Sequence, residues 1–292
     1  MSDTGGLQVF VGERVQSASE PAISVFDAGF QSGDAVWEGL RVYGGRVFRL
    51  EQHLRRLEAS AKAVRLRLPR DAAGIAAAID ETLQANEMRE DTHIRLMVTR
   101  GTRSTSGMDP RNAPAQGTLV IVPEHKEVPA SPSPQRLRTA SVRRPTPQVL
   151  DPSIHHSNQL NSILARLEIL DEPDVDATLM LDTDGFVAEA DTANIFCVSE
   201  GVLKTPLPTA CLHGITREIV LGLGENLGYE VRETHLTLFD LYTAEEVFVT
   251  GTVCELVPIT VVDARLIGSG EPGSHWRRLL DAYRELVRAE TA

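Results

Sequence analysis

Apolar positions in the first half of the chain recur with two periods, and each period predicts one type of element. Spacings of four and three residues over Leu50–Leu68 predict a helix that Pro69 ends. Asp71 is the expected N-cap of a second helix. Strict alternation over Thr92–Arg100 predicts a half-buried strand whose polar face carries Arg95.

The rest of the chain combines the same two periods. A helical stripe covers Leu160–Leu170, with Ser157 as its expected cap, and a last helix is expected over Ser274–Arg288. Strand-like pieces are expected within Val25–Phe48 and near 178–181, 186–190, 194–198 and 247–250, and a further helix over 216–227. The mixture predicts an α/β (mixed α+β) protein.

A proline-rich stretch divides the chain. Residues 123–135 contain four prolines, which remove backbone donors, so we expect neither a helix nor a central strand there. We therefore expect a small N-terminal α/β domain over residues 1–123, an interdomain linker over 124–135 and a larger C-terminal domain over 136–292.

Composition narrows the class of protein. The 292 residues carry a formal net charge of −12, which argues against a protein that binds nucleic-acid phosphates. The three cysteines form no C-x-x-C pair, the stretch MSDTGGLQVF has no signal-peptide pattern, and no apolar run approaches the ~20 residues that span a bilayer. We expect a cytoplasmic protein that is not embedded in a membrane. Its lysines are only Lys62, Lys126 and Lys204.

Two glycines suggest anion sites. Gly214 precedes a predicted helix, so free backbone N–H groups and the Thr216 hydroxyl are suited to a phosphate. Gly251-Thr252 ends a predicted strand and suits close approach of an anion. Taken alone, an ordinary capped helix and an ordinary strand end explain the two patterns as well.

Charged residues on predicted elements offer further candidates. Glu189 lies in a strand with few other polar groups and could bind a cationic ring nitrogen, or it could face solvent. Arg95 could clamp a substrate carboxylate or form a surface ion pair. Arg56 is most simply a solvated charge on its helix.

Two adjacent histidines, His155 and His156, form the remaining candidate. Neighbouring side chains point in different directions, and no set of ligands at zinc spacing surrounds them, so we expect no metal site. A histidine there is structural or a catalytic acid or base.

In this order, the motifs resemble the class IV aminotransferases, the fold type IV enzymes that use pyridoxal phosphate (PLP). The resemblance covers about Ile23–Gly273. It is carried by the runs ISVFDAGFQSGDAVWEGLRVYGGRVFRLEQHLRRL, DATLMLDTDGFVAEADTANIFCV, LKTPLPTACLHGITRE and AEEVFVTGTVCELVPI. It implies the two-domain fold type IV architecture.

The resemblance also implies roles for single residues. Arg56 would bind the PLP phosphate, with the backbone of Ile215 and Thr216 and the hydroxyl of Thr252. Leu212 would pack on the pyridine ring, and Glu189 would keep the ring nitrogen protonated. Arg95, with the backbone near Val253 and Cys254, would lie near the substrate carboxylate. The motif WEGLR and the dipeptide Gly251-Thr252 favour a branched-chain-like amino acid or 2-oxo acid substrate.

One position departs from the family. The Schiff-base lysine of the family lies three or four residues before an asparagine that opens a helix. Three residues before Asn158 stands His155, and four before stands Ile154. Gln159 also replaces the usual tyrosine. Imidazole cannot hold PLP as an imine, although it can act as a base.

Three interpretations follow. The first is an aminotransferase-like enzyme that binds PLP or pyridoxamine phosphate noncovalently, with ordinary transamination in doubt. The second is a different enzyme on the same scaffold, without PLP, acting on a small anionic substrate. The third is a non-catalytic ligand-binding homologue. The resemblance further implies a homodimer.

Overall fold

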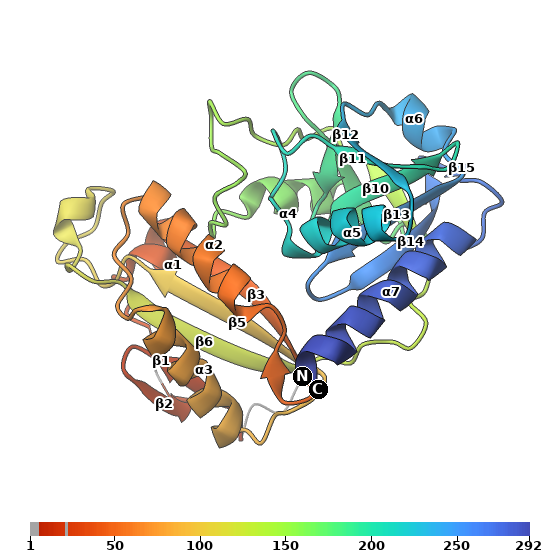
Figure 1. Ribbon diagram of the computed structural model, residues 1–292. Helices are drawn as coiled ribbons and strands as arrows, with labels where there is room; N and C mark the ends of the chain where they lie inside the picture. Colours follow the sequence, from red (N-terminus) through yellow and green to blue (C-terminus); the bar gives the residue numbers. More distant parts are fainter. Residues whose placement is uncertain (1–5, 21–22) are drawn as a thin grey trace. The chain divides into compact units, whose positions relative to one another are not determined.

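The chain folds into two compact units, in a computed structural model that describes residues 6–20 and 23–292 (Figure 1). Residues 1–5, part of the stretch considered for a signal peptide, lie outside the described residues. The first unit extends to Val128 and includes Ile154–Asn158 and Arg288–Ala292; the second comprises Pro129–Ser153 and Gln159–Val287. Segments 154–158 and 288–292 thus group with the N-terminal unit, although the expected boundaries place them in 136–292.

The first unit is built on a six-stranded sheet in the order β2-β1-β6-β5-β3-β4. All neighbouring strands are antiparallel. The strands are β1 (Gln8–Val11), β2 (Arg14–Ser17), β3 (Ala35–Tyr43), β4 (Arg46–Val47), β5 (Thr92–Thr99) and β6 (Thr118–His125).

Helices α2 (Leu50–Ala63) and α3 (Ala72–Ala85) pack against this sheet and share its apolar core. The alternation predicted for β5 is confirmed, because Ile94, Leu96 and Val98 are fully buried in that core. Since Glu38 is paired with Leu96, its side chain is on the core side of β3. Trp37 and Arg95 therefore lie on the opposite face of the sheet.

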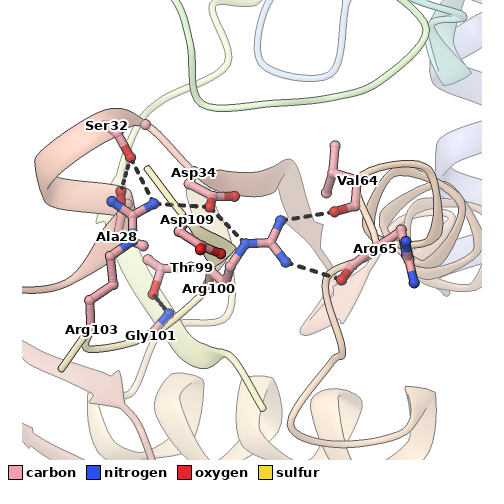
Figure 2. Close-up of polar contacts among 12 residues, drawn as sticks. Ala28, Ser32, Asp34, Val64, Arg65, Thr99, Arg100, Gly101, Arg103 and Asp109 are labelled. Atoms are coloured by element: carbon pink, nitrogen blue, oxygen red, sulfur yellow. Dashed lines mark hydrogen bonds and ion pairs between the residues drawn. The ribbon is translucent and has the colours of Figure 1, made fainter. Parts of the chain in front are cut away.

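Helix α2 ends earlier than predicted. It stops at Ala63, and Arg65 adopts a left-handed conformation with φ 52°, well before Pro69. The guanidinium of Arg100 donates to the carbonyl oxygens of Val64 and Arg65 at 2.8 and 3.0 Å (Figure 2). The N–H groups of Arg65 and Leu66 donate back to the carbonyls of Lys62 and Ala61, so a left-handed C-terminal cap ends this helix, and the proline does not.

A short helix, α1 (Ala28–Ser32), replaces part of the strand expected within Val25–Phe48. The Asp27 carboxylate caps it by accepting from the N–H groups of Gly29 and Phe30. Arg103 contacts Ser32 at the end of this helix and Asp34 beyond it (Figure 2). Local capping thus outweighs the weak strand pattern.

Two distant segments complete the first unit. Ile154–Asn158 runs beside β3: the N–H of Trp37 donates to the carbonyl of His155 at 2.9 Å, and Val36 and His156 form an antiparallel bridge. In the other segment, Glu290 accepts from Arg49 at 2.5 Å.

The second unit contains a nine-stranded mixed sheet in the order β12-β11-β10-β13-β14-β7-β8-β9, with β15 paired to β14. Its core lines one side of the strands. The strands are β7 (Gln135–Thr139), β8 (Ala177–Leu181), β9 (Val187–Ala190), β10 (Asn194–Ser199), β11 (Val202–Pro206), β12 (Glu230–Thr234), β13 (Glu246–Gly251), β14 (Glu255–Val262) and β15 (Arg265–Leu266).

Four helices belong to the second unit wholly or in part: α4 (Leu160–Leu167), α5 (Ile215–Asn226), α6 (Leu238–Tyr242) and α7 (Ser274–Thr291). Ser157 is not the cap of α4. The N-cap position is Gln159, which makes no side-chain cap hydrogen bond. Ser157 lies before it, and its N–H donates to the carbonyl of Ala35. The apolar stripe of α4 is exposed: Leu160, Ile163, Leu164, Leu167 and the nearby Leu170 are 44–74% accessible.

The start of the proline-rich stretch still belongs to a strand, since β6 continues through Pro123 to His125. There β6 pairs with β5, whereas its pairing with β1 stops at Phe10–Ile121. The missing N–H of the proline therefore breaks no ladder bond. Within residues 6–20 and 23–292, no helix is long and apolar enough to cross a membrane.

Candidate functional site

The first unit gathers polar side chains around one buried carboxylate. Glu38 on β3 is fully inaccessible and accepts a bidentate pair of bonds from Arg56 on α2, at 2.8 and 2.6 Å. His53 Nδ1 on α2 lies 2.7 Å from Oε2 of Glu38, and His155 Nδ1 lies 3.1 Å from Oε1. We call Glu38, His53, Arg56 and His155 the Glu38 cluster.

Charge keeps this carboxylate ionised. Burial by itself would raise the pKa of Glu38, but the Arg56 cation and the hydrogen bonds from Arg56 and His155 outweigh burial and hold that pKa well below its usual range. Burial lowers the pKa of His53, and hydrogen bonding to Glu38 opposes the shift. The cluster therefore contains one negative and one positive charge and two histidines that favour the neutral form.

His155 is held by its backbone as well as its ring. Its N–H donates to Ser60 Oγ of α2 at 3.0 Å, and its carbonyl accepts from Trp37. The imidazole lies 4.2 Å from the Trp37 ring, between centroids. Burial lowers the pKa of His155 despite the opposing attraction of Glu38. A neutral, fixed imidazole results.

Arg95 reaches the same tryptophan. Its guanidinium carbon lies 4.0 Å from the Trp37 ring centroid, and burial lowers the pKa of Arg95. The structure thus places three predicted residues, Arg56, Arg95 and His155, around Glu38 and Trp37. Arg56 is not a solvated helix charge, because its side chain is only 14% exposed and is paired with Glu38.

The second unit holds a separate network around Glu189 on β9. This buried carboxylate forms an ion pair with Arg144 at 2.6 Å. It also accepts from Asn194 Nδ2 at 3.3 Å and from the N–H of Leu212 at 3.2 Å. Burial raises the pKa of Glu189, while Arg144 and the Leu212 N–H oppose the shift. The alternative that Glu189 faces solvent is wrong.

The loop before α5 is fastened to this network. Asn194 Nδ2 donates to the carbonyl of Leu212 at 2.9 Å, and a Cβ on Gly214 would meet Asn194 Oδ1 at 2.0 Å. Gly214 is the N-cap of α5 and supplies no side chain to cap the helix. The first turn, with Ile215 and the buried Thr216, therefore presents backbone N–H groups suited to an anion.

Thr252, Val253 and Cys254 form the tip of the hairpin between β13 and β14 and are half-buried. Thr250 lies next to this tip and opposite Asn194 in the sheet. Among the described residues, its buried Oγ1 has no hydrogen-bond partner. A buried hydroxyl without a partner beside an uncapped helix start fits a ligand with polar oxygens, such as a phosphorylated cofactor.

Sequence reasoning missed five of these residues: Glu38, His53, Arg144, Asn194 and Thr250. Two of them carried a readable signal. Glu38 interrupts the buried alternation of Val36, Leu40 and Val42 along β3, as a carboxylate on an apolar face. His53 directly precedes Leu54 of the apolar stripe, so a polar ring borders the buried face of this helix. For the other three, we find no local signal.

Neither network has the composition of a metal site. The described residues contain no group of three or more His, Cys, Asp or Glu side chains that could hold a metal ion. None of the three lysines belongs to either network: Lys62 is in the last turn of α2, Lys126 follows β6 and Lys204 is on β11.

Comparison with known proteins identifies the family. Residues 35–262 match the family Amino-transferase class IV. The chain is 43% identical over 282 residues to "Branched-chain-amino-acid aminotransferase-like protein 2" of Arabidopsis thaliana, and covers 96% of its own length but about half of that relative. It is 38% identical to "Putative branched-chain-amino-acid aminotransferase" of Methanocaldococcus jannaschii, with 96% of both chains covered.

Solved structures agree with these relatives. The fold superimposes with a TM-score of 0.89 on the branched-chain aminotransferase from the thermophilic archaeon Thermoproteus uzoniensis with norvaline, at 31% identity, covering 96% of this chain and 94% of the other. A branched-chain amino acid aminotransferase complexed with N-(5'-phosphopyridoxyl)-L-glutamate gives a TM-score of 0.91 at 30% identity, with 97% and 94% covered. The predicted fold class, a two-domain fold type IV architecture of mixed α and β elements, is thereby confirmed. The chain belongs to the class IV aminotransferase family.

Proposed function

We propose that this protein binds PLP or pyridoxamine phosphate noncovalently and acts on an amino acid or its 2-oxo acid, with His155 as an acid–base group in place of the lysine of the family. The observation that carries the proposal is the place of His155: its imidazole is fixed in the Glu38 cluster, and no lysine belongs to that cluster. Imidazole can carry a proton but cannot form a lasting imine with the cofactor.

The residues of the second unit fit the cofactor. Glu189 is the anion that a protonated ring nitrogen needs, and Arg144 favours its ionised form. The N–H groups of Ile215 and Thr216, with the Thr252 and Thr250 hydroxyls, would hold the phosphate. When bound, the cofactor supplies an electron sink for the carbanion at the substrate Cα.

The first unit supplies groups for the substrate. Arg95, stacked on Trp37, presents a cation to a substrate carboxylate. Arg56 donates two bonds to Glu38, and we propose a second role for it in binding the cofactor phosphate. The branched-chain aminotransferases among the relatives support a branched-chain-like substrate.

A titration tests cofactor binding. The purified protein is mixed with PLP or pyridoxamine phosphate, followed by absorbance, then treated with borohydride and analysed by mass spectrometry. We expect saturable binding of both cofactors and no borohydride-stable adduct on the chain. A stable adduct on the wild-type protein contradicts noncovalent binding. Absence of binding refutes the proposal and favours an enzyme that works without PLP.

Two substitutions then separate the roles of His155. His155→Lys should gain a borohydride-stable adduct, which shows that the site accepts the cofactor at the expected distance. His155→Ala should keep cofactor binding and lose amino transfer, measured with a panel of branched-chain amino acids and 2-oxo acids. General acid–base groups contribute about 10²–10⁴-fold, so the loss should fall in this range. Unchanged transfer in His155→Ala excludes the acid–base role, and no transfer by the wild-type protein supports a non-catalytic homologue.

We further propose that two copies associate through the exposed stripe of α4. Leu160, Ile163, Leu164 and Leu167 recur on one helix face, and a second copy offers an identical apolar face for a two-fold contact. Sedimentation should give a mass near twice 31.9 kDa for the wild type and near 31.9 kDa for Leu164→Glu. A monomeric wild type refutes this assembly. A cytoplasmic location is supported by the cysteine spacing, and localisation of a tagged protein tests it.

A further inference from the structure

The Glu38 carboxylate accepts as many hydrogen bonds as its two oxygens can. Oε1 faces Arg56 Nε at 2.8 Å and His155 Nδ1 at 3.1 Å. Oε2 faces Arg56 Nη2 at 2.6 Å and His53 Nδ1 at 2.7 Å. An ionised carboxylate has about four acceptor positions and no donor. Each of these neighbouring nitrogens must therefore present a hydrogen to it.

This requirement decides where the proton of the neutral His155 ring lies. If Nδ1 carried a lone pair, that lone pair would point at a carboxylate oxygen 3.1 Å away and repel it. Arg56 Nη2 also lies near Nδ1, but at 3.5 Å its contact is longer. The carboxylate is closer and fully buried, so the hydrogen belongs on Nδ1.

We propose that Glu38 is a positioning residue that fixes His155 as the Nδ1–H tautomer and so makes Nε2 the atom that accepts and returns the proton in catalysis. The catalytic part rests on the proposed function, whereas the tautomer does not. The bond made by one ring nitrogen of a histidine sets the state of the other nitrogen.

The surroundings oppose other arrangements of the ring. The charged and titratable groups that act most strongly on the His155 ring belong to the Glu38 cluster, with Arg56 and His53 from α2 and Glu38 from β3. The Trp37 ring packs against the imidazole, while Ser60 and Trp37 hold its backbone. A flip of the ring would move Nδ1 away from Glu38 and leave Oε1 with a single hydrogen bond, from Arg56 Nε.

The test is a long-range ¹H–¹⁵N spectrum of protein labelled with ¹⁵N-histidine, recorded at pH 7.5 without added cofactor. His155→Asn identifies the His155 signals by their loss. We expect a pyrrole-type Nδ1 and a pyridine-type Nε2 in the wild type. Glu38→Gln has a single acceptor oxygen and an amide that can donate to Nδ1, so the two nitrogen types should exchange.

His53→Asn is the matched control. It alters another partner of Glu38 while keeping a donor near the position of Nδ1, so the His155 tautomer should stay as in the wild type. A wild-type spectrum with a pyridine-type Nδ1 overturns the proposal even if Glu38→Gln does not fold. An unchanged tautomer in a folded Glu38→Gln also overturns it. If the tautomer is as expected but no cofactor binds, Glu38 still positions His155 and only the proposed function fails.

Discussion

The buried ion pair between Arg144 and Glu189 allows a quantitative test of the second unit. We consider Arg144→Met, which keeps much of the apolar stem and removes the charge. Arg144 is 14% exposed and Glu189 7% exposed at the side chain. In this variant, Glu189 keeps only its bonds from Asn194 and from the Leu212 N–H. The carboxylate then lacks a charged partner in a buried site.

Removing one partner of a buried ion pair costs about 3–5 kcal/mol. Because two neutral donors remain on Glu189, we expect the low end, about 3 kcal/mol at pH 8, or roughly 6–12 °C in Tm. Burial already raises the pKa of Glu189, and loss of Arg144 raises it further. When the pKa of a carboxyl group is higher in the folded than in the unfolded protein, the folded protein becomes less stable as pH rises through that pKa. The destabilisation should therefore be smaller at pH 5 than at pH 8.

Urea unfolding at pH 5 and pH 8 measures both effects. Arg138→Met is the matched control, because Arg138 forms an exposed pair with Glu172 and should change stability by at most about 0.5 kcal/mol. In a Glu189→Gln background, the cost of Arg144→Met should fall by more than about 1 kcal/mol. The reasoning is refuted if Arg144→Met lowers the free energy of unfolding less than Arg138→Met does. It is also refuted if Arg144→Met lowers this free energy equally in the wild-type protein and in Glu189→Gln.

Three further predictions concern stability, each measured by urea unfolding. Gly214→Ala should cost about 1–3 kcal/mol, since its Cβ would meet Asn194 Oδ1 at 2.0 Å, and a neutral result would mean that the loop shifts freely. Glu246→Ala should lower the free energy of unfolding by about 1–2 kcal/mol, because this carboxylate accepts hydrogen bonds from two N–H groups of the first turn of α7 at 2.9 and 2.7 Å. Glu246→Gln should lower it less. Equal losses in the two variants would contradict a cap that acts through its charge. Burial lowers the pKa of His93 to about 4, so the wild-type protein should become less stable as pH falls from 6.5 to 4. His93→Gln should lose less stability over this range. Parallel curves of stability against pH for the two proteins would exclude His93 as a source of the acid destabilisation.

Local patterns were enough for α3, for β5 and for several site residues. The alternation over β5 placed Arg95 on the face opposite the core, because a strand of period two leaves no other choice. Gly214 before α5 indicated an uncapped helix start, which the structure contains. The proline rule failed at α2, where a left-handed cap at Arg65 ends the helix before Pro69 is reached.

The Glu38 cluster could not be predicted in the same way. His155 meets Glu38 across 117 residues of chain, and nothing local to either residue specifies the other. The apolar period of α4 showed that one face of the helix differs from the other, but a period does not state what covers that face, and the stripe is exposed. Residue partners distant in sequence follow from packing, which a single sequence does not display.

Residues 288–292 at the end of α7 belong to the first unit, and this has a consequence for synthesis on the ribosome. The last of these residues is made 164 positions after Val128 (292 − 128), where the first stretch of that unit ends. At about 5–20 residues per second, this interval lasts roughly 8–33 s. During that time, the first unit lacks the ion pair of Arg49, at the start of α2, with Glu290 and, until Ile154–Asn158 emerges, the segment beside β3. The nascent first unit should therefore stay open to proteases and chaperones until the last helix is complete.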